Sequence, residues 1–301
     1  MKPLFGFARF NALAVRLALG VAVMPFAGAP AAAQEAVIEK TAIEQATQDR
    51  LWDALGVGEA LEIMRQEGKT LAIDVADQYL AGRASNGWTR DIDTIYDPSS
   101  MDQMMREGMF DDLEGAQTAP MLAFFEAELG RRIVSLEMSA RRAFLDPDTE
   151  SAARERVRNL DEPDTGKSGL GQGRLDLIDE FIAANDLVDY NSSGSMNTNV
   201  AFLKGLAQAE VFEMSEQDIL DRVWNESEAG RLDTKEWLRA YLATAYQPLT
   251  DAEIRAYINF SRTDAGQRLN RALFAGFGEM YSSQYYALGL AVAKQLGAQD
   301  I

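Results

Sequence analysis

Residues 249–267 read LTDAEIRAYINFSRTDAGQ, and they contain two clear helix-start signals. Thr250 and Glu253 have the spacing of a capping box, in which each side chain accepts a hydrogen bond from the other residue's backbone N–H. The apolar residues that follow lie at helical intervals, namely Ile254, Tyr257 and Ile258. Thr263 then precedes a second apolar pattern that continues to about Leu296. The stretch therefore predicts the junction between two consecutive α-helices.

The same helical period dominates the rest of the chain. Apolar residues recur at steps of three or four in two further segments, which contain Leu61, Met64, Leu71, Val75 and Tyr79 in one and Leu122, Phe125, Leu129, Ile133 and Leu136 in the other. Thr118 precedes Pro120 in a typical helix start, and Asp146-Pro147 predicts the end of that helix. No run of alternating β-branched residues indicates a strand. The sequence therefore predicts an all-α fold.

A glycine-rich segment divides the chain. Residues 161–173 read DEPDTGKSGLGQG, a composition that favours neither helix nor strand. We interpret them as a linker between an N-terminal helical half, residues 34–160, and a C-terminal helical half, residues 174–301. The predicted architecture is two related amphipathic halves that pack together as a helical bundle.

Local matches between the halves indicate this relation. Residues 51–55 (LWDAL) have the form of residues 177–181 (LIDEF). The other matches pair 123–125 (AFF) with 256–258 (AYI), and 129–133 (LGRRI) with 265–269 (AGQRL). The stretch between these last two matches has three residues in the first half and six in the second. Chance similarity is the alternative, because apolar periodicity alone produces such matches.

The C-terminal block resembles a known family. Residues 249–254 (LTDAEI), 257–261 (YINFS) and 263–267 (TDAGQ) are similar to the signature of the exported proteins called domain of unknown function 2059. The resemblance covers residues 249–290 and extends more loosely back to residue 174. It implies a signal peptide and helical content, and the family name implies no activity. The first half departs from the pattern with Arg131 in place of Gln267.

The first 33 residues have the features of a secretory signal peptide. Lys2 and Arg9 supply positive charge, a largely apolar stretch follows, and Ala31 and Ala33 offer a small-x-small cleavage site before Gln34. The apolar core is shorter than the roughly 20 residues that span a bilayer, although an N-terminal membrane anchor is the alternative. No later segment is apolar enough for a stable span. We expect cleavage near Ala33 and a mature chain in the periplasm.

Composition excludes several classes of function. Asp and Glu outnumber Lys and Arg by 47 to 29, and the net charge of −18 would repel phosphate backbones and anionic lipids. We therefore expect no nucleic-acid partner, and instead an envelope protein or a small ligand. The chain has no cysteine and no histidine, which excludes disulfides, Cys/His zinc sites and Ser–His–Asp mechanisms. No motif calls for a cofactor.

One segment partly matches a calcium-binding loop. Asp189, Asn191 and Ser193 occupy three alternating oxygen-ligand positions, and Gly194 follows where the loop bends. Val200 stands where the loop needs a bidentate glutamate. A helix-to-helix loop that uses its polar side chains as caps is therefore the preferred interpretation.

Paired carboxylates supply the remaining acid–base chemistry. Asp176 and Glu180 share a helix face through their spacing, as do Asp218 and Asp221. Because the chain has 47 acidic residues, such pairs arise by coincidence, and solvated acidic faces are the default interpretation. A glycosidase-like site would need two carboxylates across a cleft.

An aromatic series on the last predicted helix is a further candidate. Phe277, Tyr281 and Tyr285 recur at helical spacing, and they would line a binding groove if the face that carries them is open. Packing into the core is the preferred interpretation.

Together these features predict an exported periplasmic helical protein with a non-catalytic binding, scaffolding or envelope-assembly role. We assign no catalytic residue from the sequence. The alternative is a carboxylate-dependent hydrolase that acts on envelope glycan. A cleft with two buried acids of raised pKa would favour that alternative.

Overall fold

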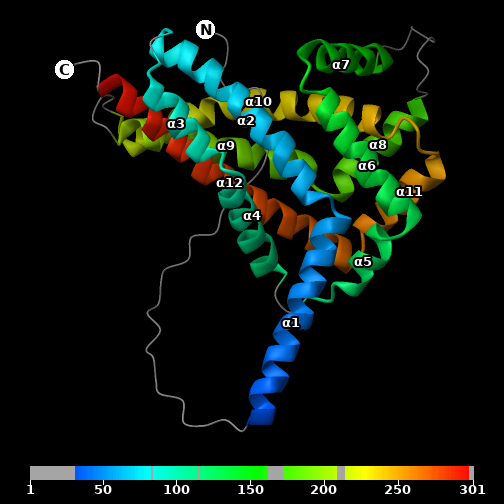
Figure 1. The fold of residues 1–301 in the computed structure, drawn as a ribbon. Helices are drawn as coiled ribbons and strands as arrows, with labels where there is room; N and C mark the ends of the chain where they lie inside the picture. The colour runs from blue at the N-terminus through cyan, green and yellow to red at the C-terminus, as the bar shows by residue number, and fades with distance from the viewer. Residues whose placement is uncertain (1–30, 83, 114–115, 162–171, 209–213, 298–301) are drawn as a thin grey trace.

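The computed structural model describes residues 31–82, 84–113, 116–161, 172–208 and 214–297, and within these ranges every regular element is an α-helix (Figure 1). The helices are α1 (Ala31–Ala54), α2 (Val57–Leu80), α3 (Asn86–Ile95), α4 (Pro98–Asp112), α5 (Ala119–Phe125), α6 (Glu128–Ala143), α7 (Pro147–Asp161), α8 (Gln172–Ala184), α9 (Leu187–Ala207), α10 (Glu216–Ala245), α11 (Asp251–Ser261) and α12 (Asp264–Gly297). The predicted all-α helical bundle is confirmed. The predicted signal peptide up to residue 30 and linker residues 162–171 lie outside the described ranges.

The central helix of the bundle is α12, which packs against α2, α3, α4, α5, α9 and α11. Its 34 residues make a rod of about 51 Å at 1.5 Å per residue. Apolar and small side chains occur around most of its circumference, which is typical of a helix that is buried on several sides. The methionines of α4 pack into the same core, with Met101, Met105 and Met109 almost fully buried. No described helix is both long and apolar enough to cross a membrane.

A second hydrophobic cluster lies where α6 meets α8, α10 and α11. It includes Ile133 from α6, Phe181 from α8, Tyr246 from the end of α10 and Ile258 from α11. The main cluster likewise combines α2 and α4 with α9 and α12. Helices from before and after residues 162–171 therefore share both clusters.

Two helix corners in the chain have the same geometry. α5 ends at Phe125 and α6 begins at Glu128, and α11 ends at Ser261 and α12 begins at Asp264. The third residue of the second helix is a glycine in each corner. A Cβ on Gly130 would lie 2.2 Å from the Phe124 carbonyl oxygen, and a Cβ on Gly266 would lie 2.2 Å from the Phe260 carbonyl oxygen. Only glycine permits this close approach of one helix to the end of the other.

The corners correct two sequence predictions. One continuous helix was expected from Thr118 to Asp146, but the chain turns at Glu126 and Ala127. The equal geometry also makes Phe124 equivalent to Phe260. With this pairing the two corners have the same length, whereas the sequence match needed three residues in one and six in the other. The sequence match had paired Phe124 with Tyr257, one helical turn too early.

Two further junctions resemble each other. Gly56 precedes α2 and Asp186 precedes α9, and both adopt the left-handed conformation, with φ of 64° and 49°. Aligning these junctions places Leu51 opposite Phe181 instead of Leu177, so the sequence match of residues 51–55 with 177–181 is also displaced by about one turn.

The helix caps agree with the sequence in part. The Thr250 hydroxyl accepts a hydrogen bond from the Glu253 N–H at 3.3 Å, and the Glu253 carboxylate accepts one from the Thr250 N–H at 2.7 Å. This confirms the predicted capping box. Ser215 and Asp218 form the same arrangement at the start of α10. Thr118 makes no side-chain cap bond, because its own backbone is already in the helical conformation.

Candidate functional site

A cavity of about 210 Å³ lies among α2, α6, α8, α9, α10 and α12. Most of its lining is apolar or aromatic, and the aromatic side chains include Phe181, Trp237, Tyr241, Tyr246, Tyr257 and Phe277. The polar members of the lining are few, as is usual for small-molecule sites in proteins. They comprise one carboxylate, one guanidinium and three asparagine amides in the part of the lining that the structure describes.

The carboxylate belongs to Glu137, on the apolar side of α6. Ile133, one turn before it, and Ala140, almost one turn after it, are both buried. The Tyr246 hydroxyl donates a hydrogen bond to Glu137 Oε1 at 2.6 Å, and the Tyr241 hydroxyl donates to the Glu137 carbonyl oxygen at 2.9 Å. Burial raises the pKa of Glu137 from 4.5 to about 7, although the bond from Tyr246 lowers it.

The guanidinium belongs to Arg141, one turn further along α6. It donates to both carboxylate oxygens of Glu67 on α2, with Nε–Oε1 at 3.1 Å and Nη2–Oε2 at 2.8 Å. Arg141 also lies 3.4 Å from the Tyr281 hydroxyl. Burial by itself would lower the pKa of Arg141, but the charge and hydrogen bond of Glu67, together with Tyr281 and Tyr241, raise it overall. The positive charge at this end of the cavity is therefore held in a two-pronged ion pair.

The three asparagines satisfy most of their hydrogen bonds within the backbone. The Nδ2 groups of Asn185, Asn191 and Asn270 donate to the carbonyl oxygens of Phe181, Leu187 and Asn185, respectively. Asn191 is completely buried, and its Oδ1 receives no hydrogen bond from the described residues. A buried acceptor without a donor costs free energy. Asn191 Oδ1 therefore favours a molecule in the cavity that donates a hydrogen bond to it.

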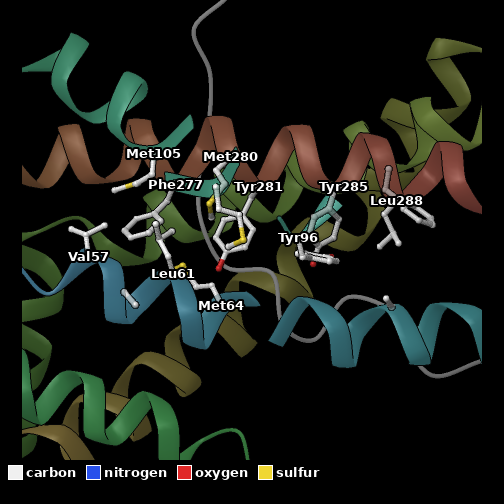
Figure 2. Packing of buried hydrophobic residues seen from close by; sticks show 14 of the residues in the cluster. Val57, Leu61, Met64, Tyr96, Met105, Phe277, Met280, Tyr281, Tyr285 and Leu288 are labelled. Atoms are coloured by element: carbon white, nitrogen blue, oxygen red, sulfur yellow. The ribbon is translucent and has the colours of Figure 1, made fainter. Parts of the chain in front are cut away.

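The aromatic series of α12 is buried, and one of its three members lines the cavity. Phe277 lines the cavity, whereas Tyr281 and Tyr285 do not. Figure 2 shows all three side chains pointing from α12 into the packed layer toward α2, and each is at most 9% exposed. The preferred interpretation as core is therefore correct for both tyrosines. No open groove runs along this face of α12 because α2 covers it.

The segment of the weak calcium-loop candidate is helical, so the preferred interpretation of a helix-to-helix loop is also wrong. Asp189, Asn191 and Ser193 lie in the first two turns of α9, where the backbone is helical. Residues two positions apart on a helix point to different sides, so Asn191 points away from Asp189 and Ser193. The three side chains therefore cannot converge on one ion. Asp189 instead forms an ion pair with Arg231. Within the described ranges, no group of three or more acidic side chains is placed to hold a metal ion.

The acidic pairs singled out in the sequence lie outside the cavity. Glu180 pairs with Arg262 at 2.9 Å, and Asp176 is exposed. Asp218 caps α10, and Asp221 accepts a hydrogen bond from Gln217 at 2.8 Å. These contacts are structural or solvated, which agrees with the default interpretation.

A wider hollow of about 580 Å³ lies between α1 and α4. Its acidic lining residues, Glu44, Glu107 and Asp111, are exposed to solvent. Arg106 in the same hollow already pairs with Asp49 and Asp102. Exposed, solvated carboxylates are the ordinary surface of an acidic protein, so we place the candidate site at the cavity beside Glu137.

The cleavage-site residues Ala31, Ala33 and Gln34 lie at the start of α1. This end of the helix extends away from the bundle (Figure 1).

Sequence reasoning missed Glu137. The available signal was its position one turn after Ile133, on a helix face that also carries the apolar residues Val134 and Ala140. A carboxylate on that face is either paired or functional, because burying a charge is costly. Comparison with known proteins adds no functional information, since no family model, curated protein or solved structure matches this chain.

Proposed function

We propose that this chain is an exported helical protein that binds a small, largely apolar molecule in the cavity beside Glu137. The observation that carries the proposal is the cavity itself, about 210 Å³ of aromatic-lined space with a carboxylate and an unsatisfied amide oxygen. An apolar cavity of about 150 Å³ suffices to bind benzene in another protein. The volume beside Glu137 is larger and has polar groups that would fix a ligand's orientation.

Export is the part of the proposal that rests on sequence. The positively charged start, the apolar stretch and the alanines before Gln34 are the supporting features. The resemblance of residues 249–267 to the exported domain of unknown function 2059 supports the same location, the periplasm. Mass spectrometry of the exported protein is expected to find Gln34 as its first residue. A chain that retains Met1 would contradict export by cleavage.

We also infer that the two helix corners descend from one duplicated unit. The supporting observations are the equivalent glycines, Gly130 and Gly266, and the equal two-residue turns before them. The left-handed junctions at Gly56 and Asp186 add a second pair of equivalent points. A duplication would explain why a binding cavity forms where helices from both halves meet.

The number of carboxylates that line the cavity favours binding over hydrolysis. A glycosidase-like mechanism uses two acids that face each other across a substrate. The described lining of the cavity contains one, Glu137. Its raised pKa is typical of a general acid, but the partner acid that the mechanism needs is not among the described lining residues.

A cavity-filling variant tests the proposed function. Ala60 lines the cavity from α2, and Ala60→Leu would add a branched side chain to that space. Toluene at saturating concentration is expected to raise the melting temperature of the wild-type protein and to leave that of Ala60→Leu unchanged. Ala123→Leu is the matched control, because Ala123 is exposed on α5. Equal stabilisation of Ala60→Leu by toluene would contradict binding in this cavity.

A further inference from the structure

The cavity offers two acceptor atoms to a ligand. The hydroxyls of Tyr241 and Tyr246 both donate to Glu137, one to its carbonyl oxygen and one to Oε1. The Nδ2 groups of the three asparagines donate to backbone carbonyls, as described above. Two acceptors are left over, Glu137 Oε2, which receives no hydrogen bond from the described residues, and Asn191 Oδ1. A ligand that donates hydrogen bonds would satisfy both of these acceptors.

The charge of the cavity favours a cation. Arg141 is the cationic side chain of the described lining, and both its Nε and Nη2 are engaged by Glu67. This leaves the ionised form of Glu137 as the uncompensated charge. A buried carboxylate is stabilised by a positively charged partner that enters the same low-dielectric space.

The aromatic lining favours the same kind of ligand. Phe181, Tyr246 and Tyr257 lie together, with ring centroids 4.7 Å apart for Phe181–Tyr257 and 5.5 Å for Phe181–Tyr246. Tyr246 in turn bonds directly to Glu137. Trp237 and Tyr241 stack at 5.0 Å on α10 nearby in the same lining. Aromatic faces attract ammonium groups, so these rings favour a cationic ligand beside the Glu137 carboxylate.

From these three observations we propose that the ligand is a small organic amine, with an apolar body among the aromatic rings and a protonated nitrogen that pairs with Glu137. This inference rests on the proposed function, since it specifies the ligand of the same cavity. The ammonium donates to Glu137 Oε2, and Asn191 Oδ1 is the second acceptor that the cavity offers to an N–H group. The proposal involves binding alone, with no bond made or broken.

The test compares three probes of similar size, namely benzylamine, benzyl alcohol and toluene, by titration calorimetry. At about pH 8 the wild-type protein is expected to bind benzylamine about tenfold or more tightly than benzyl alcohol. If none of the three binds, the proposed function itself fails. If toluene and benzyl alcohol bind and benzylamine has no advantage, the cavity binds ligands but the amine proposal is overturned.

Glu137→Gln separates the carboxylate from the shape of the cavity. It is expected to bind benzyl alcohol as the wild type does and to lose the tenfold preference for benzylamine. The control is Glu228→Gln, which removes a charge from an exposed position on α10 and is expected to keep the preference. A preference that survives in Glu137→Gln would overturn the proposal.

The wild-type protein provides a second test that needs no variant. Its benzylamine affinity is expected to fall about tenfold or more between about pH 8 and about pH 5, as Glu137 takes up a proton. The facing groups are Tyr241, Tyr246 and Tyr257 and the Arg141–Glu67 pair, and burial raises the pKa of all three tyrosines above their ordinary range. These tyrosines stay neutral across this interval. A benzylamine affinity that does not change with pH would contradict the pairing with Glu137.

Discussion

The rings of Phe124 and Phe260 stack on each other, with centroids 4.2 Å apart and planes inclined by 13°. Each ring stands at the same place in its own helix corner, six residues before the glycine that lets the two helices meet. Equivalent residues in contact with each other indicate an approximate two-fold relation between the corners. The stack therefore joins the part of the bundle before residue 161 to the part after residue 172.

A double-mutant cycle on this pair measures how strongly the corners are coupled. Phe124→Ala and Phe260→Ala are each expected to lower the free energy of unfolding by about 2 kcal/mol. The double variant is expected to lose about 1 kcal/mol less than the sum, because the ring contact is lost only once. Urea denaturation gives these values. Phe124→Ala combined with Phe144→Ala is the control and is expected to be additive, since Phe144 packs on Trp237 and Tyr241 instead.

The corner glycines are expected to tolerate no side chain. Gly130→Ala and Gly266→Ala would each drive a methyl group into backbone atoms of the preceding helix, at a cost of about 2 kcal/mol or more in unfolding free energy. Gly230→Ala is the matched control, because a Cβ there meets nothing within 4 Å. That control is expected to gain about 0.5–1 kcal/mol from helix propensity. Thermal or urea unfolding that ranks all three variants equally would contradict the close-approach argument.

The capping box on α11 is a third test. Thr250→Ala removes the side-chain acceptor for the Glu253 N–H and is expected to lower stability by about 1 kcal/mol. Thr118→Ala is expected to change stability by less than about 0.5 kcal/mol, because the Thr118 side chain caps no helix. A loss of the same size in both variants would mean that the cap bond contributes nothing specific.

The buried carboxylate makes stability depend on pH in a predictable direction. The pKa of Glu137 is about 7 in the folded protein and 4.5 for a glutamate side chain surrounded by water, so the folded state binds more protons between these values. The stability contributed by this group therefore falls as pH rises from about 4.5 to about 7, and then stays constant. Glu137→Gln removes the effect, and its stability relative to wild type is expected to rise by about 3 kcal/mol over that interval.

Chemical denaturation at a series of pH values checks this expectation. Glu228→Gln is the control, and its stability is expected to run parallel to that of the wild type, because Glu228 is exposed. If the stability of Glu137→Gln changes with pH in parallel with that of the wild type, then the Glu137 carboxylate is not desolvated in the folded protein.

The fold class could be predicted from sequence because it depends on local signals. The capping box at Thr250 and the long apolar pattern after Thr263 each act within one or two helical turns, and each has its expected counterpart. The turn at Glu126 and Ala127 was missed, since the apolar pattern of α5 continues into α6 and only the glycine at 130 marks the close approach.

The candidate site could not be predicted in the same way. The cavity requires residues from helices that are far apart in the chain, such as Glu137 and Tyr246. Periodicity indicates that a side chain is buried, but not which side chains leave a space between them. The segment of Asp189, Asn191 and Ser193 shows the same limit, because its polar and glycine-rich composition does not indicate the helix that the structure has there.

The central position of α12 determines when this protein folds. Leu288 and Val292 of α12 are fully buried in the main core, and they follow α2 and α4 in the chain by more than 150 residues. The earlier helices α2 and α4 contact α12 and lack that apolar cover until α12 has been synthesised. Native packing of the early helices is consequently completed only once α12 has been made, so folding depends on contacts between helices that are far apart in the chain.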